Sequence, residues 1–594
     1  MKDTITKLRV LFNKRDKEKF LLLFFMMIIA AIFETLGIGL IVPFVGIVTN
    51  PTIILEQPIL SNVYQLLNFQ STNTFIFFAV LVLLSVFIVK NAYLLLFYNV
   101  QYRVIFNQKV KLSRLMLMEY LTKPYIFHLQ RNSAELLRNV NGEVGKIFTG
   151  ILLASFQLLT EIIIVISILT LLLITAPIAT ITSCILLGGS VILFFKIFRK
   201  KITHLGKEDQ RLNREVIKWV NQGLGASKEV KVTGKESYFV NSYTKQSKIM
   251  ANNTIYKNTL DQIPRLFIET LLVSVVLITM VIIVMQGTDT STLVATMSLF
   301  AMAAFRLMPS ITRIVALLTS IRYSQPALTV IYNDLIKENG GKKTLLENGS
   351  IEEKPVKVNS GEKTFLNSIK LENVYFRYPN QEEYSIKNLS LTIPIGNSVA
   401  FVGTSGAGKT TIVDTILGLL EPDKGRVFVD GKELKELLPI WKNKIGYIPQ
   451  SIYLSDETIR KNVAFGINDK DIDEFAVQRA IEDAQLKDFI DSLPEGLDTV
   501  VGERGVRLSG GQRQRIGIAR ALYHNPEIIF LDEATSALDN DTEKEIMKAI
   551  DGLKGEKTLI IIAHRLSTIE NCDIVFTVDK GRLVSVNNKL KQSI

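Results

Sequence analysis

The stretch SVAFVGTSGAGKTTIVDTILGLL, residues 398–420, decides the fold of the second half of the chain. Its centre, GTSGAGKT at 403–410, fits the pattern G-x-x-x-x-G-K-[ST] and lies between a strand-like run and a helix-like run. Glycines at these positions let backbone N–H groups curl around phosphates. Lys409 can neutralise phosphate oxygens, and Thr410 can ligate Mg²⁺. The sequence therefore predicts a phosphate-binding loop in an α/β domain.

Two further motifs follow this loop. The run EIIFLDEATSALD, 527–539, reads as a buried strand that ends in two carboxylates. Asp532 is expected to hold Mg²⁺ through water, and Glu533 to polarise an attacking water. The motif LSGGQRQR, 508–515, places Ser509 and two glycines before a helix whose N–H groups favour a phosphate. Because each chain cradles its own nucleotide in the loop, this helix start is expected to contact the γ-phosphate held by a second copy.

The first half of the chain carries long apolar runs, and a membrane-spanning helix takes about 20 such residues. Candidate spans lie at approximately 20–48, 74–99, 147–176, 178–198, 262–286 and 291–321. The run after the basic N-terminus is too long for a signal-peptide core and is interpreted as a retained first span. Cys184 and Cys572 are the two cysteines, which indicates neither a disulfide framework nor a metal cluster.

Basic residues alternate between the segments that join these spans. Lysine and arginine are abundant before span 1, between spans 2 and 3, and between spans 4 and 5. They are absent between spans 1 and 2 and from QGTDTS, 286–291. This alternation predicts that both termini and both long loops are cytoplasmic. It also accounts for the formal net charge of +12 without a nucleic-acid partner.

The predicted fold class is an all-α membrane domain of six helices followed by an α/β P-loop domain. The expected boundaries are a transmembrane domain at 1–336, a polar linker at 337–362 and a nucleotide-binding domain at 363–594.

Three irregular segments interrupt the membrane half. Pro124 in one cytoplasmic loop, and Gly223 with Gly225 in the other, indicate turning points at the loop tips, with an ordinary solvated loop as the alternative. The outer segment 51–72 carries an apolar stripe at near-helical spacing. A short helix on the outer membrane face is predicted there, and an apolar loop packed against the spans is the alternative.

Taken together, the motifs resemble the nucleotide-binding domain of ABC transporters. Six spans followed by one such domain resemble an ABC exporter half-transporter of the type IV fold. The resemblance implies that ATP and Mg²⁺ are bound and that ATP hydrolysis is coupled to transport. It implies that Tyr378 stacks on adenine, Gln450 senses Mg²⁺ and water, His564 contacts the γ-phosphate, and Asp539 lies at a dimer interface. No motif position departs from the pattern, which implies a homodimer with two competent ATP sites.

The residues assigned in this way form three groups. The catalytic group is Glu533, His564 and Gln450, and the metal group is Thr410, Gln450 and Asp532. The nucleotide-binding group is Tyr378, Gly403, Thr404, Ser405, Gly406, Ala407, Gly408, Lys409, Thr410, Thr411, Ser509, Gly510, Gly511, Gln512 and Asp539.

Ionisable residues in or near the spans are candidates for cargo recognition. Arg306 and Arg313 are seven residues apart and therefore share one face of span 6. Lys90 lies towards the end of span 2, and Arg265 lies at the start of span 5, where Glu269 could pair with it. In a homodimer this set predicts a basic wall that favours an anionic cargo, such as a phosphate or pyrophosphate headgroup. The alternative for each residue is local pairing or snorkelling to the interface.

The spans also resemble those of the PglK-like flippases of lipid-linked oligosaccharides. The shared stretches are FETLGIGLIVPFV in span 1, IPRLFIE in span 5 and FRLMPSITRI in span 6. Lys90 stands where that family has an arginine, which keeps the charge and loses the bidentate fork. The resemblance implies an ATP-driven flippase in the inner (cytoplasmic) membrane that moves a polyprenyl-pyrophosphate-linked oligosaccharide from the inner to the outer leaflet. A multidrug, lipid or peptide exporter and a non-transporting membrane ATPase are the alternatives.

Overall fold

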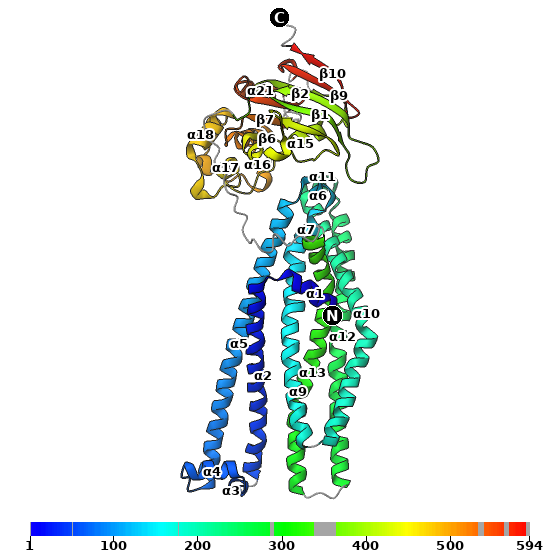
Figure 1. Ribbon diagram of the computed structural model, residues 1–594, viewed down its shortest axis with the longest axis vertical. Helices are drawn as coiled ribbons and strands as arrows, with labels where there is room; N and C mark the ends of the chain where they lie inside the picture. Colours follow the sequence, from blue (N-terminus) through cyan, green and yellow to red (C-terminus); the bar gives the residue numbers. More distant parts are fainter. Residues whose placement is uncertain are drawn as a thin grey trace. The chain divides into compact units, whose positions relative to one another are not determined.

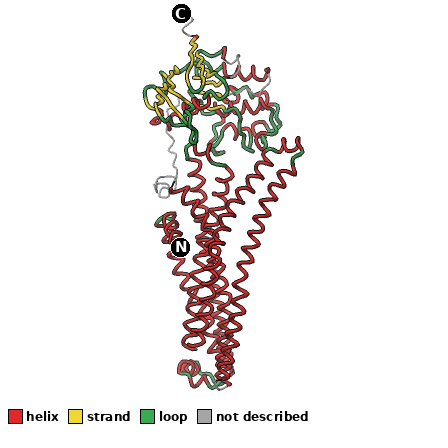
Figure 2. Tube along the Cα trace, turned by 90° about the vertical axis from the view of Figure 1, so that its right-hand side faces the viewer, coloured by secondary structure: helices red, strands yellow, loops and turns green. Residues whose placement is uncertain are grey.

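The computed structural model describes residues 2–49, 51–175, 177–285, 290–337, 364–532, 540–563 and 569–589. The chain forms two compact units, Met1–Lys123 with Arg131–Ile351, and Pro124–Gln130 with Glu352–Ile594. Within the described residues the first unit is helical and the second holds every strand (Figure 2). The predicted fold class, a helical membrane domain followed by an α/β domain, is confirmed. All but the first residue of the predicted linker 337–362 lies outside the described residues.

Long helices that run side by side build the first unit (Figure 1). They are α2 (Lys14–Thr49), α5 (Thr72–Thr122), α9 (Ala154–Thr175), α10 (Pro177–Gly225), α12 (Glu236–Met285) and α13 (Thr290–Tyr332). Each contains one predicted span or most of it. Several extend well beyond the predicted span.

Length and hydropathy alone qualify four stretches of the described residues as membrane spans. These are Lys14–Gly37, Thr72–Thr122, Ser133–Thr170 and Leu307–Ile336. Their large apolar side chains are often exposed, as for Leu95 on α5, which is 73% exposed. Side chains of this kind suit contact with lipid rather than with a protein core.

Short helices occupy the irregular segments of the membrane half. They are α1 (Lys2–Leu11), α3 (Ile53–Glu56), α4 (Pro58–Leu66), α6 (Tyr125–Gln130), α7 (Ser133–Arg138), α8 (Val144–Lys146) and α11 (Ser227–Thr233), with π-helical turns at Asn139–Glu143, Ile147–Leu153 and Asn333–Lys337. The short helix predicted in the outer segment is present as α3 and α4. Ile54 of α3 is fully buried against Ile47 and Phe75. The outer segment is therefore helical and also packs against the spans.

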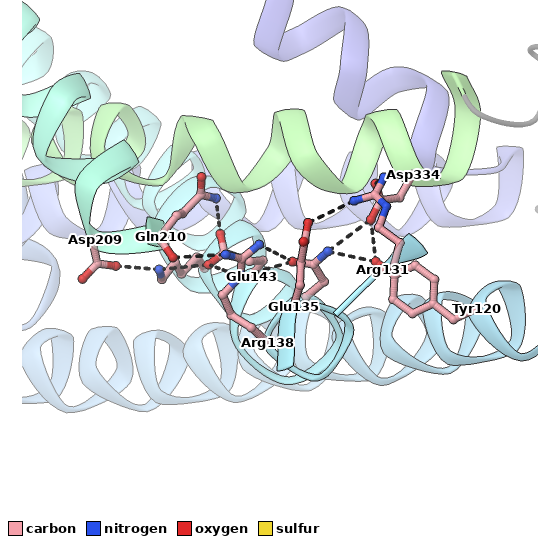
Figure 3. A network of polar contacts seen from close by, with 10 residues as sticks. Tyr120, Arg131, Glu135, Arg138, Glu143, Asp209, Gln210 and Asp334 are labelled. Atoms are coloured by element: carbon pink, nitrogen blue, oxygen red, sulfur yellow. Dashed lines mark hydrogen bonds and ion pairs between the residues drawn. The ribbon is translucent and has the colours of Figure 1, made fainter. Parts of the chain in front are cut away.

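A polar network joins the ends of α5 and α13 to the π-helical turn that follows α7 (Figure 3). Asp334, which is 4% exposed, accepts hydrogen bonds from Tyr120 Oη at 2.5 Å and from Asn139 Nδ2 at 3.1 Å. Arg131, just after α6 in the chain, lies 3.9 Å from the other Asp334 oxygen. Two buried donors and the half-buried Arg131 thus surround this carboxylate, as a buried charge requires.

The same network continues to α10 through Glu143, which is fully buried (Figure 3). Glu143 accepts a hydrogen bond from Gln210 and pairs with Lys146 at 3.2 Å. Lys146 also lies 2.6 Å from Asp209. Removal of Lys146 would leave the buried Glu143 carboxylate without its cation. These contacts therefore hold α10 firmly against the segment that carries Glu143.

The second unit holds two sheets. The strands are β1 (Ser368–Phe376), β2 (Ile386–Pro394), β3 (Ser398–Val402), β4 (Lys424–Val429), β5 (Lys432–Glu433), β6 (Ile445–Ile448), β7 (Ile528–Asp532), β8 (Thr558–Ile562), β9 (Ile574–Asp579) and β10 (Arg582–Asn588). One sheet has the order β2-β1-β4-β5, and the other has the order β10-β9-β3-β8-β7-β6. The first sheet is antiparallel. In the second, β9, β3, β8, β7 and β6 are parallel.

Helices accompany these sheets. They are α15 (Lys409–Ile416), α16 (Leu434–Lys444), α17 (Ile459–Val463), α18 (Glu474–Asp483), α19 (Lys487–Asp491), α20 (Gly510–Leu522) and α21 (Asn540–Asp551). One buried core contains residues of β3 and β7 together with α17, α18 and α20. A second contains residues of both sheets with α15 and the buried Trp441 of α16. The near-continuous apolar runs of β3, β7 and β8 are typical of parallel strands buried on both faces.

Candidate functional site

The phosphate loop lies at the carboxyl end of β3, an interior strand of the six-stranded sheet. β3 is buried along nearly its whole length and pairs in parallel with β8 and β9. β6 and β7 are parallel to it, so their carboxyl ends reach the same sheet edge. This brings the loop, Asp532 at the end of β7, and Gln450 just after β6 to one edge, where ligands of open α/β sheets bind.

Glycine is required at two positions of the loop. Gly406 has φ +79° and Gly408 has φ +101°, a region that side chains disfavour. A Cβ at Gly408 would lie 2.8 Å from the carbonyl oxygen of Ser385, so no side chain fits there. Lys409 Nζ donates to the carbonyl oxygens of Gly403 at 2.8 Å and Thr404 at 3.1 Å, which holds its charge over the loop. This glycine cradle, with a lysine at the helix start, fits the phosphates of ATP.

The remaining loop residues have mixed environments. Thr404, Ser405 and Thr410 are exposed, whereas Ala407 and Thr411 are buried. Exposed hydroxyls at the helix start suit metal or phosphate contact, and the buried residues fix the helix on the sheet.

Tyr378 lies beside the helix that follows the loop. Its Oη and Thr411 Oγ1 are 3.2 Å apart and share a hydrogen bond. Its ring packs edge-on against Phe376, with the centroids 5.0 Å apart. Burial raises the pKa of the Tyr378 phenol. The structure therefore brings this predicted adenine-stacking residue next to the loop and leaves its ring half-buried.

A second carboxylate, which the sequence analysis did not single out, accompanies Asp532. Asp414 on α15 is 8% exposed, and burial together with the nearby Asp532 raises its pKa to about 6. Two neighbouring carboxylates, Asp414 buried and Asp532 half-buried, attract a cation, so the surroundings of Asp532 fit Mg²⁺, which would neutralise phosphate charge when bound. The sequence signal that could have identified Asp414 is its position one helical turn after Thr410.

Helix α6 also belongs to the second unit, although it comes from a loop of the membrane half. Ile126 packs against the core that contains α15. Burial, with the charges of Asp414 and Asp532, raises the pKa of the Tyr125 phenol. The sequence pointed to Pro124 as a turning point but gave no sign that the following aromatic residues group with the nucleotide-binding unit.

Ser509 is the N-cap of α20. Its Oγ accepts from Gln512 N at 3.2 Å, and its own N–H donates to Gln512 Oε1 at 2.8 Å, which forms a capping box. Ser509 and Gly510 are exposed, and Gly511 is half-buried. The motif is therefore a stable helix start at the surface, available to a partner molecule.

Three predicted residues, Glu533, Asp539 and His564, lie outside the described residues. Gln450 is exposed at the sheet edge that carries the loop. The structure thus brings together Tyr378, the loop, Asp532 and Gln450.

The four predicted intramembrane cations differ in whether a carboxylate pairs with them. Lys90 Nζ lies 3.2 Å from Glu34 Oε2, and both side chains are nearly buried, at 11% and 12% exposed. Lys90 also lies over the Phe87 ring, 4.9 Å from its centroid. For Lys90 the alternative of local pairing is observed.

Arg313 is paired as well. Its Nη1 lies 3.1 Å from Oε1 of Glu161 on α9. Arg265 is exposed on α12, and within the described residues no ion pair joins it to the exposed Glu269. Arg306 lies on α13, and its side chain is outside the described part of the structure. Carboxylates of neighbouring helices therefore pair with two of the four members of the predicted basic wall, and the role of the wall in cargo recognition stays a prediction.

Comparison with known proteins agrees with this architecture. Residues 19–308 match the model of the ABC transporter transmembrane region, and residues 386–536 match the ABC transporter model. The ATP-dependent lipid A-core flippase of Ralstonia nicotianae is 31% identical over 491 residues, which cover 81% of this chain and 78% of that protein. Mouse ATP-binding cassette sub-family B member 10, mitochondrial, is 43% identical over 264 residues, 43% of this chain and 37% of that protein. A solved bacterial Atm1-family ABC exporter with ATP bound has a similar fold, with a TM-score of 0.75 and 24% identity over 97% of this chain and 96% of that one.

The phosphate cradle, the helical membrane unit and these matches define the class of protein: the chain belongs to the ABC transporter family. Within that family it is an exporter half-transporter, with one membrane domain followed by one nucleotide-binding domain. It binds ATP, and it is an ATPase whose hydrolysis is coupled to transport across a membrane.

Proposed function

We propose that this exporter is a flippase that moves an anionic amphiphile from the inner to the outer leaflet, and that its cargo is a polyprenyl-pyrophosphate-linked oligosaccharide. The observation that carries the proposal is the pair Arg313–Glu161, which lies between two apolar helices. Charged residues within membrane helices are rare and mark cargo pathways. A carrier of neutral drugs has no need for them.

The geometry of this pair suits exchange with an anion. Arg313 is 48% exposed while Glu161 is 9% exposed, so one side of the guanidinium remains open. A guanidinium binds phosphate oxygens through parallel hydrogen bonds. An incoming pyrophosphate can therefore bind the open side of the guanidinium while Glu161 stays paired with the other side. Arg306, on the same helix, and Arg265 are proposed to add positive charge to the path, and Lys90 is proposed to enter it only when released from Glu34.

The energy source is assigned to the residues of the nucleotide site. The loop 403–411 and Tyr378 would hold ATP, and Thr410, Gln450 and Asp532 would hold Mg²⁺. Glu533 would polarise the attacking water, and His564 would contact the γ-phosphate. We propose a homodimer, in which Ser509, Gly510, Gly511 and Gln512 of one chain face the nucleotide of the other and Asp539 lies at the interface. The nucleotide-binding domain, 363–594, would lie in the cytoplasm beneath the inner membrane.

A second candidate cargo is a phosphorylated glycolipid of the lipid A type. Several relatives that are 31% identical over about four fifths of this chain are named lipid A-core flippases. Both candidate cargoes join a phosphate-bearing head to a glycan, so the same arginine chemistry serves either one.

The test is reconstitution of the full chain in liposomes with a fluorescent lipid-linked oligosaccharide in both leaflets. ATP-dependent loss of inner-leaflet label is expected, and the Glu533→Gln protein is the inactive control. Transport of a labelled lipid A analogue instead would select the second candidate. Active transport of a cationic drug, with neither lipid moved, would contradict the proposal.

A further inference from the structure

A basic cavity lies between α10 and α13, apart from the ion pairs described above. Its volume is about 330 Å³, and it is lined by Arg199, Lys200, Thr203, His204, Lys207 and Arg322. The five α10 residues follow the spacing i, i+1, i+4, i+5 and i+8, which places them on one face of that helix. In the sequence the basic members of this set contribute only to the charge of the segment between spans 4 and 5.

A glycine brings the two helices together at this cavity. A Cβ at Gly206 would lie 2.2 Å from the carbonyl oxygen of Tyr323, so α10 and α13 touch backbone to backbone. Arg322 precedes Tyr323 directly. The contact therefore fixes Arg322 beside the basic face of α10 and closes one side of the cavity.

The cations of this cavity differ from those further along α10. Towards the end of that helix Arg211 pairs with Glu208 at 3.4 Å, and Lys218 pairs with Glu215 at 3.5 Å. Among the described residues, no carboxylate lines the cavity. Arg199, Lys200, Lys207 and Arg322 have no ion-pair partner among the described residues.

No ion pair with a described residue offsets the repulsion between these cations. Like charges that converge on one concavity destabilise a fold unless an anion joins them. A general excess of positive charge on the cytoplasmic side requires neither convergence nor a cavity. The arrangement is therefore more specific than the charge bias of an ordinary cytoplasmic loop.

The position of the cavity along the helices indicates the source of the anion. Arg199 directly follows the predicted span 178–198, and Arg322 directly follows the predicted span 291–321. On the predicted topology both residues lie at the cytoplasmic surface of the membrane, at the depth of the headgroups. We propose that the cavity binds the phosphate of an anionic phospholipid of the inner leaflet. This site is separate from Arg313. The proposal does not depend on which cargo the exporter moves.

Binding of phosphatidylglycerol to the purified full-length protein tests the inference. Native mass spectrometry in detergent, with phosphatidylglycerol and phosphatidylcholine titrated in parallel, measures how much of each lipid is retained. The wild-type protein is expected to retain phosphatidylglycerol preferentially. The double variant Arg199→Gln with Arg322→Gln is expected to weaken that retention roughly tenfold or more, since each basic residue contributes attraction to an anionic headgroup.

A matched control and a second variant keep the result interpretable. Lys245→Gln with Lys248→Gln removes the same charge from exposed positions of α12 outside the cavity, and is expected to retain the lipid as the wild type does. Lys200→Gln with Lys207→Gln alters exposed residues of the cavity, whose loss does not endanger folding, and should weaken retention in the same direction. Equal retention by cavity and control variants would overturn the site. Displacement of the lipid by millimolar inorganic phosphate would assign a free-anion site and overturn the lipid assignment.

Discussion

Arg313 Nη1 on α13 lies 3.1 Å from Glu161 Oε1 on α9, and the two partners differ sharply in exposure, at 48% and 9%. The second carboxylate oxygen of Glu161 is buried and has no hydrogen-bond partner in the part of the chain that the structure describes. The carboxylate therefore depends on the arginine, whereas the arginine retains access to other anions. This asymmetry separates a structural role of the pair from a role in cargo recognition.

Single and double substitutions at this pair should give different patterns. Arg313→Gln leaves a buried carboxylate unpaired and should destabilise the protein by about 1–3 kcal/mol, since the arginine is only half-buried. The double change with Glu161→Gln should recover most of that stability but not flipping. Thermal unfolding in detergent and the liposome assay, with basal ATP hydrolysis as a check on folding, measure the two effects. Recovery of flipping in the double variant would show that the pair is structural.

Gly408→Ala should abolish ATP binding. The substitution places a Cβ 2.8 Å from the Ser385 carbonyl oxygen and forces the loop to open. Gly431→Ala is the control, because Gly431 also has positive φ, +79°, but has open space around it. The control should lose only about 1–2 kcal/mol of stability and keep its ATP hydrolysis. Nucleotide binding measured by fluorescence, together with thermal unfolding, distinguishes the two. Normal ATP affinity in Gly408→Ala would show that the cradle is wrongly assigned.

Ser509→Ala tests whether the exposed start of α20 acts beyond capping. Loss of the cap should lower stability by about 1 kcal/mol. Asp473→Ala removes a comparable cap, since Asp473 accepts from Phe475 N at 2.9 Å at the start of α18. Steady-state ATP hydrolysis should fall in Ser509→Ala and remain near normal in Asp473→Ala. Equal activities in the two variants would restrict Ser509 to a structural role.

Asp414 should give the protein a pH-dependent stability. Its pKa is raised from 3.8 to about 6 in the folded state, chiefly by burial. Between about pH 4 and 6 the folded chain holds a proton that the unfolded chain has released. The free energy of unfolding therefore falls as pH rises through this window, by as much as about 3 kcal/mol, and this contribution is constant above it.

Thermal unfolding of wild type and Asp414→Asn, without Mg²⁺, measures this effect. The variant should gain stability relative to the wild type as pH rises from 4.5 to 6.5, because its amide does not ionise. A constant difference between the two proteins across this range would contradict the raised pKa.

Most of the nucleotide site was predictable because its chemistry is local in sequence. A glycine loop between a buried strand and a helix needs only neighbouring residues, and so does the cap at Ser509. Asp532 was predictable because it ends a strand-like run, whereas Gln450 was predicted from the family resemblance alone. The structure brings both to the same sheet edge because β6 and β7 are parallel. The length of the apolar runs likewise located the long helices of the membrane unit, because a run of about 20 apolar residues spans the membrane.

Partners contributed by distant helices were not predictable. Glu34 and Glu161 were visible as ionisable residues, but which cation each one meets depends on how α2, α5, α9 and α13 pack. The basic cavity between α10 and α13 depends on a backbone contact at Gly206, a residue that looks ordinary in the sequence. Asp414 and Asp532 lie close together in the fold although they are more than a hundred positions apart in the sequence.

The membership of α6 in the second unit has a consequence for biosynthesis. The ribosome makes Tyr125–Gln130 long before the strands of the second unit, so the core of that unit packs against a helix that was synthesised just after the second span. A separately expressed fragment beginning at residue 364 would lack Ile126 and expose the apolar surface that this residue covers. Studies of the isolated nucleotide-binding unit would then use a molecule in which this apolar surface is uncovered. Adding the α6 peptide in trans is the direct way to cover it.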